Sequence, residues 1–208
     1  MLKSLAIVGL LLTSVAAHAE QRAALVVGND NYDHLPDLTK AVNDAKAMGA
    51  TFKDLGYQVT IGTDLNHKSW LDLVQKFTSS LEKDSTAVVY IAGHGLNVGG
   101  TQYIVLTDAP EIAPKASAET FLASAINFDV FLQALGKTQA STLLIIFDSC
   151  RNNPFDRAAE SLSQITDIKQ NMAMMFSASP GSCPFETVGS ADTSTTSPFV
   201  RILIEELQ

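Results

Sequence analysis

Two apolar runs rich in β-branched residues constrain the fold of this chain more than any other feature of its sequence. They are residues 88–92 (VVYIA) and 143–147 (LLIIF). Uninterrupted apolar runs of this length are typical of strands that are buried on both faces of a parallel sheet. His94 follows the first run and Cys150 follows the second. Because the carboxyl ends of parallel strands meet at one edge of a sheet, we expect the imidazole and the thiol to lie at a common edge.

Other short apolar runs alternate with segments whose apolar residues recur at helical spacing. Strands are predicted at residues 22–28, 57–61, 86–92, 101–106, 142–147 and 171–177, and helices at 38–55, 70–81, 128–135 and 198–207. This alternation predicts an α/β fold in which helices cover both faces of a mostly parallel sheet. Residues 107–123 and 179–197 are predicted surface loops, and loops of this length at a sheet edge are commonly functional.

The N-terminal residues resemble a signal peptide. Lys3 precedes an apolar segment at 5–12, and residues 17–19 (AHA) form a small-x-small cleavage site. The apolar segment is too short to span a bilayer comfortably, so we expect residues 1–19 to be removed rather than to anchor the chain. The prediction is an exported protein, periplasmic or secreted, with a single domain at residues 20–208 and no stable membrane anchor.

The net charge of the chain limits the classes of molecule that it is expected to bind. The chain has 14 basic and 22 acidic residues, for a formal net charge of −8. It contains no basic run, which argues against nucleic acid and favours a cationic ligand or substrate segment. Residues 27–31 (VGNDN) lack the glycines of a dinucleotide-binding loop, so nucleotide binding at the sheet edge is the weaker alternative.

Only two cysteines are present, Cys150 and Cys183. In an exported protein they either pair with each other or leave at least one reactive thiol. A thiol at a strand end can also be an inert core residue. However, Cys150 is followed by the polar, turn-forming residues 151–154 (RNNP), which favours a thiol at the end of the strand.

A thiol and an imidazole at one edge indicate nucleophilic catalysis, since a neighbouring base favours the attacking thiolate. Glycines flank His94 on both sides. Gly95 would let a backbone N–H approach a substrate carbonyl and form an oxyanion hole together with the N–H of Cys150. Otherwise, these glycines mark only a flexible turn that leaves the strand.

Two acidic residues complete the candidate site. Asp148 lies two positions before Cys150, so both side chains would share one side of the strand. Asp44 lies near the start of the first predicted helix. Each also has a structural explanation, since strand-end aspartates bind loop N–H groups and aspartates in a first helical turn complement the helix dipole.

Several segments, in this order along the chain, resemble those of caspase-like cysteine peptidases of the bacterial kind, near the paracaspases, metacaspases and orthocaspases. The matching segments are residues 24–29 (ALVVGN) with Tyr32, 41–45 (AVNDA), 90–95 (YIAGHG), 103–108 (YIVLTD), 148–155 (DSCRNNPF) and 197–199 (SPF). The resemblance implies a caspase-like three-layer sandwich with about six strands. It also implies a His94–Cys150 dyad with an oxyanion hole from the amides of Gly95 and Cys150.

In arginine-specific relatives, acidic residues that match Asp44 and Asp148 line the primary specificity pocket. The resemblance therefore implies an endopeptidase whose protein or peptide substrate carries Arg or Lys before the cleaved bond. The cysteine motif lacks the pattern of true caspases and of metacaspases, so neither aspartate specificity nor calcium activation carries over, and no cofactor or metal is expected. Relatives usually continue beyond the position of Gln208, so the domain is expected to be incomplete at its C-terminus.

The alternative is a caspase-like pseudoenzyme or peptide-binding module without turnover, silenced by a Cys150–Cys183 disulfide or by the short C-terminus. For the peptidase, we expect Cys183 to border the cleft and to remain unpaired in the active form.

Overall fold

A five-stranded parallel sheet forms the centre of the computed structural model, which describes residues 20–112, 118–155, 170–189 and 191–208. Its strands are β1 (Arg22–Gly28), β2 (Gln58–Thr63), β3 (Thr86–Ala92), β7 (Thr142–Asp148) and β8 (Met172–Phe176). They lie in the order β2-β1-β3-β7-β8, and every neighbouring pair is parallel. The predicted parallel sheet is confirmed, with five strands among the described residues rather than about six.

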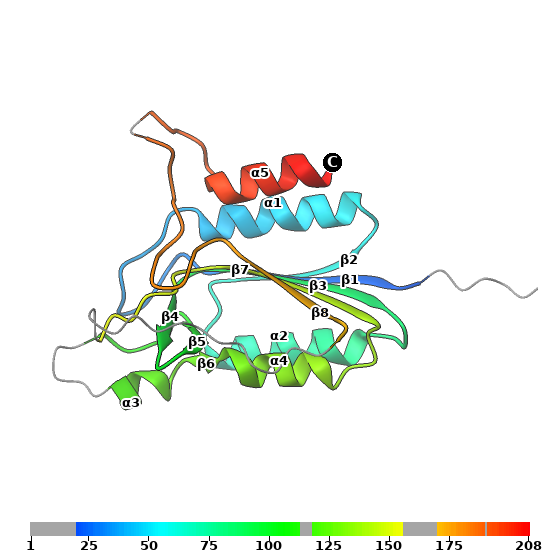
Figure 1. Cartoon of the computed structure of the whole chain (residues 1–208), viewed down its shortest axis with the longest axis horizontal. Helices are drawn as coiled ribbons and strands as arrows, with labels where there is room; N and C mark the ends of the chain where they lie inside the picture. The colour runs from blue at the N-terminus through cyan, green and yellow to red at the C-terminus, as the bar shows by residue number, and fades with distance from the viewer. Residues whose placement is uncertain (1–19, 113–117, 156–169, 190) are drawn as a thin grey trace, which may run out of the picture.

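Helices cover both faces of this sheet and give a three-layer sandwich (Figure 1). On one face lie α1 (Ala41–Asp54) and α5 (Pro198–Leu207), and on the other lie α2 (His67–Ser80) and α4 (Phe128–Gly136). None of the helices that the structure describes combines the length and apolar character needed to cross a membrane. The predicted signal peptide lies outside the described residues.

The apolar strands alternate between the two helical layers because successive side chains of a strand point to opposite faces. In β3, Val89 and Ile91 pack with the side chains of α2 and α4, while Val88 and Tyr90 pack with those of α1 and α5. The same alternation runs through β7, where Ile146 contributes to the α1/α5 side. The residues that directly follow these two strands therefore lie on a defined side of the sheet.

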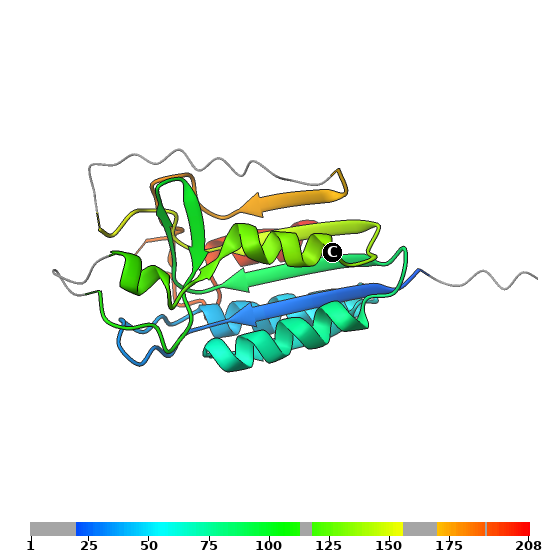
Figure 2. The same ribbon diagram turned by 90° about the horizontal axis from the view of Figure 1, so that it is seen from below.

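A small antiparallel sheet stands at the end of the main sheet to which its strands point (Figure 2). It consists of β4 (Gly95–Val98), β5 (Thr101–Ile104) and β6 (Ile126–Asn127), in that order. The predicted strand at 101–106 is thus one arm of a hairpin. The prediction of an uninterrupted loop at 107–123 is wrong, because α3 (Ala118–Leu122) lies within it, where the buried ring of Phe121 anchors the helix.

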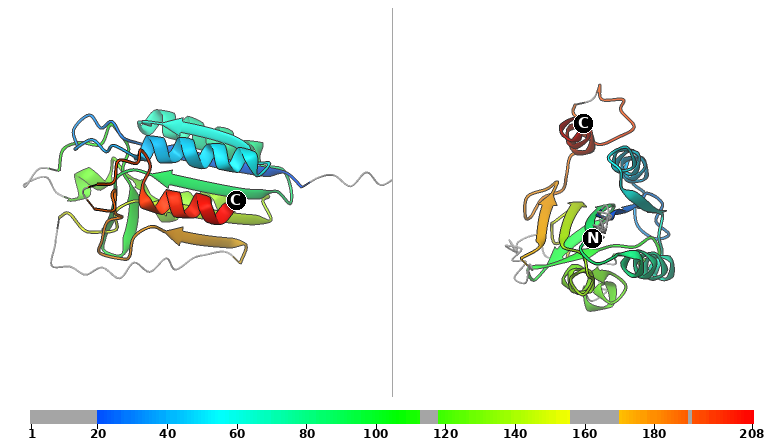
Figure 3. Two further views of the ribbon diagram at one scale, coloured as in Figure 1. Left: turned by 90° about the horizontal axis from the view of Figure 1, so that it is seen from above. Right: turned by 90° about the vertical axis from the view of Figure 1, so that its right-hand side faces the viewer.

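Side-chain caps define where three helices begin. The Asn66 side chain accepts the Ser69 N–H at the start of α2, and the Asn127 side chain accepts the Val130 N–H at the start of α4. Ser197 caps α5 ahead of Pro198, as the sequence predicts. Seen from above the sheet, α1 and α5 run side by side, and both begin near the edge to which the strands point (Figure 3). Residues at the start of either helix can therefore reach that edge.

Candidate active site

The register between β3 and β7 brings His94 and Cys150 together. Ala92 and Asp148 are direct partners in this parallel pair. His94 lies two residues beyond Ala92, and Cys150 lies two residues beyond Asp148, so each side chain follows its strand by the same distance. The two residues line the same pockets. The predicted common edge is therefore present, and it results from the parallel pairing of β3 with β7.

Two groups from the loop before α1 hold the imidazole of His94. Its Nε2 lies 2.7 Å from the carbonyl oxygen of Pro36. The Tyr32 ring lies 4.5 Å from the imidazole, between centroids, and the Tyr32 hydroxyl accepts the backbone N–H of His94 at 2.8 Å. These contacts fix the orientation of the ring relative to the sheet edge.

Gly95 lies in a close contact that a side chain would disrupt. A Cβ atom at this position would come within 2.8 Å of the Ser149 Cβ and 2.9 Å of the Cys150 carbonyl oxygen. The glycine thus allows β4 to pack directly against the segment that carries Cys150. The Gln102 side chain donates to the same Cys150 carbonyl at 3.1 Å, which further ties the hairpin to this segment. The predicted oxyanion role of the Gly95 and Cys150 amides stays a prediction.

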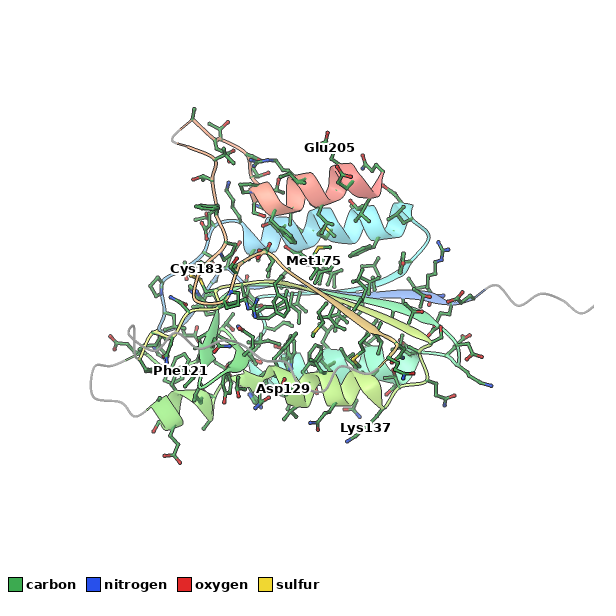
Figure 4. The ribbon with its side chains drawn as sticks, viewed as in Figure 1. Phe121, Asp129, Lys137, Met175, Cys183 and Glu205 are labelled. Atoms are coloured by element: carbon green, nitrogen blue, oxygen red, sulfur yellow. A yellow bond between two sulfur atoms is a disulfide. The ribbon has the colours of Figure 1, made fainter. Side chains whose placement is uncertain are left out.

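Cys150 forms a disulfide with Cys183 (Figure 4). Two backbone hydrogen bonds flank it: the Arg151 N–H donates to the Ser182 carbonyl, and the Gly181 N–H donates to the Arg151 carbonyl. The expectation that Cys183 is unpaired in the active form stays a prediction; Cys183 borders the pocket, as expected, and here it is paired. The reason is the close approach of the segment after β8 to the end of β7, which leaves the two Cα atoms 4.0 Å apart. The structure thus describes the oxidised form of the site.

Asp44 and Asp148 meet in a pocket of about 270 Å³ beside Cys150, which we call the acidic pocket. Asp148 follows the α1/α5 side of β7, and α1 presents Asp44 toward the same space. The remaining lining residues are Leu38, Lys40, Ala41, Ala92, Gly93, His94, Cys183, Pro184, Phe185, Glu186 and Ser197. The sequence-based pairing of these two carboxylates in one pocket is thus what the structure shows.

Both carboxyl groups are withdrawn from water. Asp44 is 2% exposed and accepts the Ser197 N–H at 2.8 Å, and burial raises its pKa to about 6. Asp148 is 7% exposed and accepts the Tyr90 hydroxyl at 2.9 Å, and burial raises its pKa as well. The charge of Asp148 adds to the rise at Asp44. A cation that entered this pocket would stabilise the ionised form of both groups and so offset the cost of their desolvation.

Two further charged residues of the acidic pocket were not predicted. Glu186 lies on the exposed segment after β8, and its charge raises the pKa of Asp148. Lys40 is buried, donates to the Thr196 carbonyl at 3.3 Å, and lowers the pKa of Asp44. Among these four groups, three are acidic and one is basic. The only sequence signal for Glu186 was its place in the predicted loop 179–197.

A metal site is not evident in the part of the chain that the structure describes. There, no group of three or more His, Cys, Asp or Glu residues has the arrangement that could hold a metal ion. The site thus places the His94 imidazole and the disulfide-bonded Cys150 beside the acidic pocket.

Comparison with known proteins gives a consistent result. The family model described as "Caspase domain" matches residues 21–208. A protein named paracaspase from Dictyostelium discoideum is 27% identical over 206 residues, covering 92% of this chain and 46% of that protein. The human mucosa-associated lymphoid tissue lymphoma translocation protein 1 is 25% identical over 169 residues, covering 81% of this chain and 20% of that protein. The chain thus spans less than half the length of these relatives.

A solved structure shares the fold. The crystal structure of caspase-1 from Spodoptera frugiperda superposes with a TM-score of 0.64 at 19% identity, covering 91% of this chain and 69% of that one. At this level of identity the similarity concerns the fold, and it agrees with the caspase-like three-layer sandwich expected from the sequence.

Proposed function

Because the chain belongs to the caspase-domain family of peptidases, we propose that it is a cysteine endopeptidase that cleaves its substrates after arginine or lysine. In this proposal Cys150 is the nucleophile, and His94 acts as the general base and general acid. The backbone amides of Gly95 and Cys150 hold the oxyanion. Asp44 and Asp148 bind the basic side chain of the residue before the cleaved bond.

The observation that carries the proposal is the meeting of two buried carboxyl groups beside Cys150. Asp44 comes from a helix and Asp148 from a strand, and neither forms an ion pair within 4.0 Å among the described residues. Buried carboxylates are costly unless a cation compensates them. A guanidinium presents a planar array of donors that suits two carboxylates, and an ammonium supplies a compact charge. Arginine and lysine side chains therefore match the pocket.

The first half of the reaction follows from the arrangement of these groups. The Cys150 thiolate attacks the carbonyl carbon of the bound residue, and the tetrahedral oxyanion is stabilised by the two amides. The C–N bond then breaks, and His94 donates a proton to the leaving amine. A thioester joins the substrate to Cys150. In the second half, His94 removes a proton from water, which hydrolyses the thioester and regenerates the thiol.

The contact with Pro36 assigns the ring nitrogens of His94. A carbonyl oxygen can only accept, so Nε2 carries hydrogen toward Pro36. The tautomer follows from this hydrogen-bond assignment. In neutral imidazole, Nδ1 then has the lone pair that accepts the proton of the Cys150 thiol. No carboxylate is required for this orientation.

The disulfide favours a second candidate, a binding module that lacks turnover. While Cys150 is bonded to Cys183 it cannot attack a carbonyl. The acidic pocket is nonetheless formed in this oxidised structure. A module of this kind would bind basic peptide segments and release them uncleaved, whether or not a reductant is present.

The N-terminal sequence supports a location for either function. We place the protein outside the cytoplasm, periplasmic or secreted after cleavage near Ala19, with residues 20–208 forming one caspase-like domain. Exported proteins meet oxidising conditions in which a disulfide can persist. N-terminal sequencing of the protein from the medium and the periplasm tests this placement, and a mature protein that begins at Met1 would contradict it.

The test of function uses reduced protein and peptides that differ only in the residue before the cleaved bond. We expect hydrolysis after arginine and lysine and none after aspartate or leucine, and we expect Cys150→Ala to remove it. Cleavage after aspartate would contradict the specificity. If the reduced protein binds arginyl peptides without hydrolysing them, the binding module is the correct function.

A further inference from the structure

A second pocket adjoins the reactive pair on the side away from the two aspartates. It has a volume of about 190 Å³ and shares only His94 and Cys150 with the acidic pocket. Its other side chains are mainly apolar: Leu35, Leu96, Val105, Ile112, Phe121 and Pro154. Pro36, Gly95 and Asn152 complete the lining, and apart from the shared His94 no acidic or basic residue is present in the lining that the structure describes. We call it the apolar pocket.

The apolar pocket rests on a packed floor. Leu96, Val105 and Phe121 are each 3% exposed or less and belong to one hydrophobic cluster. They come from β4, from the segment after β5 and from α3, which lies at the same end of the sheet (Figures 2 and 4). Leu35 and Ile112 pack against this cluster and are only partly buried. The pocket is therefore a preformed apolar surface that remains open at its rim.

The chemistry of peptide cleavage indicates which residue of the substrate would meet the apolar pocket. If the side chain before the cleaved bond occupies the acidic pocket, its carbonyl carbon lies at Cys150. The leaving amine belongs to the next residue, and that amine must lie within reach of the His94 ring to receive a proton. His94 and Cys150 are the two residues that both pockets share, so the next residue passes from the acidic pocket toward the apolar one.

We propose that the apolar pocket binds the side chain of the residue that directly follows the cleaved bond, and that this side chain is apolar. The inference rests on the proposed endopeptidase function and deepens it: the substrates carry a basic residue followed by an apolar residue such as leucine. Ligand pockets for whole small molecules usually measure about 300–1,000 Å³. A cavity below that range suits one side chain.

The test is a series of internally quenched peptides with arginine before the bond and leucine, alanine, glycine, lysine or aspartate after it. With reduced protein, we expect kcat/KM for leucine to exceed that for alanine by about tenfold, since pocket contacts of one to a few methylene groups discriminate by this amount. Glycine should be cleaved more slowly than alanine, and aspartate should be cleaved least. Equal rates across the series would overturn the subsite and leave the proposed function standing. Absence of hydrolysis of every peptide would overturn both.

Two variants distinguish a change in the apolar pocket from a general effect of adding a carboxylate to the surface. Ile112→Glu adds a carboxylate at the open rim, and we expect it to abolish the leucine preference and to favour lysine after the bond. Val130→Glu makes the same change at a residue of α4 that is 60% exposed and outside the pocket, and it should keep the leucine preference. A peptide aldehyde ending in arginine has nothing beyond the carbonyl, so its inhibition constant should be equal for both variants. A leucine preference that survives Ile112→Glu would contradict the assignment.

Discussion

The imidazole of His94 is oriented by a backbone carbonyl, that of Pro36, rather than by a carboxylate. The distance from Nε2 to this oxygen is 2.7 Å. Both Pro36 and Tyr32 lie in the loop between β1 and α1, so one loop supplies both the oxygen that faces Nε2 and the Tyr32 ring, whose plane is tilted by 51° to the imidazole. The orientation of the His94 ring is therefore set by a neutral acceptor.

Removing the Tyr32 hydroxyl should reduce the rate of the chemical step. In Tyr32→Phe the N–H of His94 loses its acceptor, and an unpaired polar group in such a site costs about 1–3 kcal/mol. We expect kcat to fall by about tenfold, while KM for an arginyl peptide stays within about twofold. Steady-state kinetics measures both, and Tyr57→Phe, just beyond the C-terminal end of α1, is the matched control. An unchanged kcat would show that Tyr32 does not position His94.

Activity should depend on reduction of the Cys150–Cys183 disulfide. A dithiol transfers two electrons and two protons to this bond and becomes a disulfide itself, which leaves both cysteines as thiols. We expect the oxidised wild-type protein to be inactive and the reduced protein to be active. Cys183→Ser should be active without reductant, because Cys150 then has no partner.

Two controls accompany the reductant experiment. Ser182→Ala changes the neighbouring residue and should keep the wild-type dependence on reductant. Thiol alkylation followed by mass spectrometry should find no free thiol in the oxidised protein and two after reduction. A folded Cys183→Ser variant without activity would assign Cys183 a direct part in catalysis.

Neutralising the buried Asp148 should weaken recognition of arginine more than neutralising the exposed Glu186. Asp148→Asn keeps an oxygen that can accept the Tyr90 hydroxyl but removes the charge. Hydrogen bonds to charged groups contribute about 1.5–3 kcal/mol, so kcat/KM for arginyl peptides should fall by roughly 10- to 100-fold. Glu186→Gln, at an exposed position, should have a smaller effect. If Asp148→Asn cleaves arginyl peptides at the wild-type rate, the basic side chain binds elsewhere.

Stability should fall as the pH rises through the titration range of Asp44. Burial raises its pKa from 3.8 to about 6 in the folded state, so between these values the folded chain binds more protons than the unfolded chain. The free energy of unfolding then decreases with pH by at most about 1.4 kcal/mol per unit from this group. Chemical denaturation of Asp44→Asn and wild type from pH 4 to 7 measures the difference. A pH-independent difference between the two proteins would contradict the raised pKa.

The same titration should control ligand binding. Asp148, Glu186 and Lys40 also face the acidic pocket, and the net charge there becomes more negative as Asp44 loses its proton. Benzamidine, an amidinium without a peptide bond, should therefore bind more tightly as the pH rises through about 6. Affinity that is constant over this range would show that Asp44 does not face the bound cation.

The sheet and its reactive edge could be predicted because they depend on local patterns. The apolar runs of β3 and β7 specify buried strands, and the polar residues that follow specify the edge. Asp148 was placed correctly because strand periodicity alone sets its side. The strand at 101–106 was also predicted, and the structure has it as β5, Thr101–Ile104. By contrast, β6 consists of two residues, too few to show any periodicity.

Other features depend on contacts between segments far apart in the chain. The helix expected from residue 38 begins at Ala41, because Leu38 packs against hydrophobic clusters from within the loop and so continues the apolar pattern before the helix starts. Glu186 reaches the acidic pocket through the path of the segment after β8. The disulfide was left open as an alternative, because two cysteines alone do not specify the distance between them.

The disulfide also determines how cleavage of the chain itself would be detected. Cys150 and Cys183 are the ends of a covalent loop that contains β8. A single cut anywhere inside this loop would leave two fragments joined through sulfur, with the mass of the intact chain plus one water. Such a nicked protein would migrate as one species in a non-reducing gel and as two in a reducing gel. After reduction, only the non-covalent contacts, including the β7–β8 ladder, would hold the fragments together.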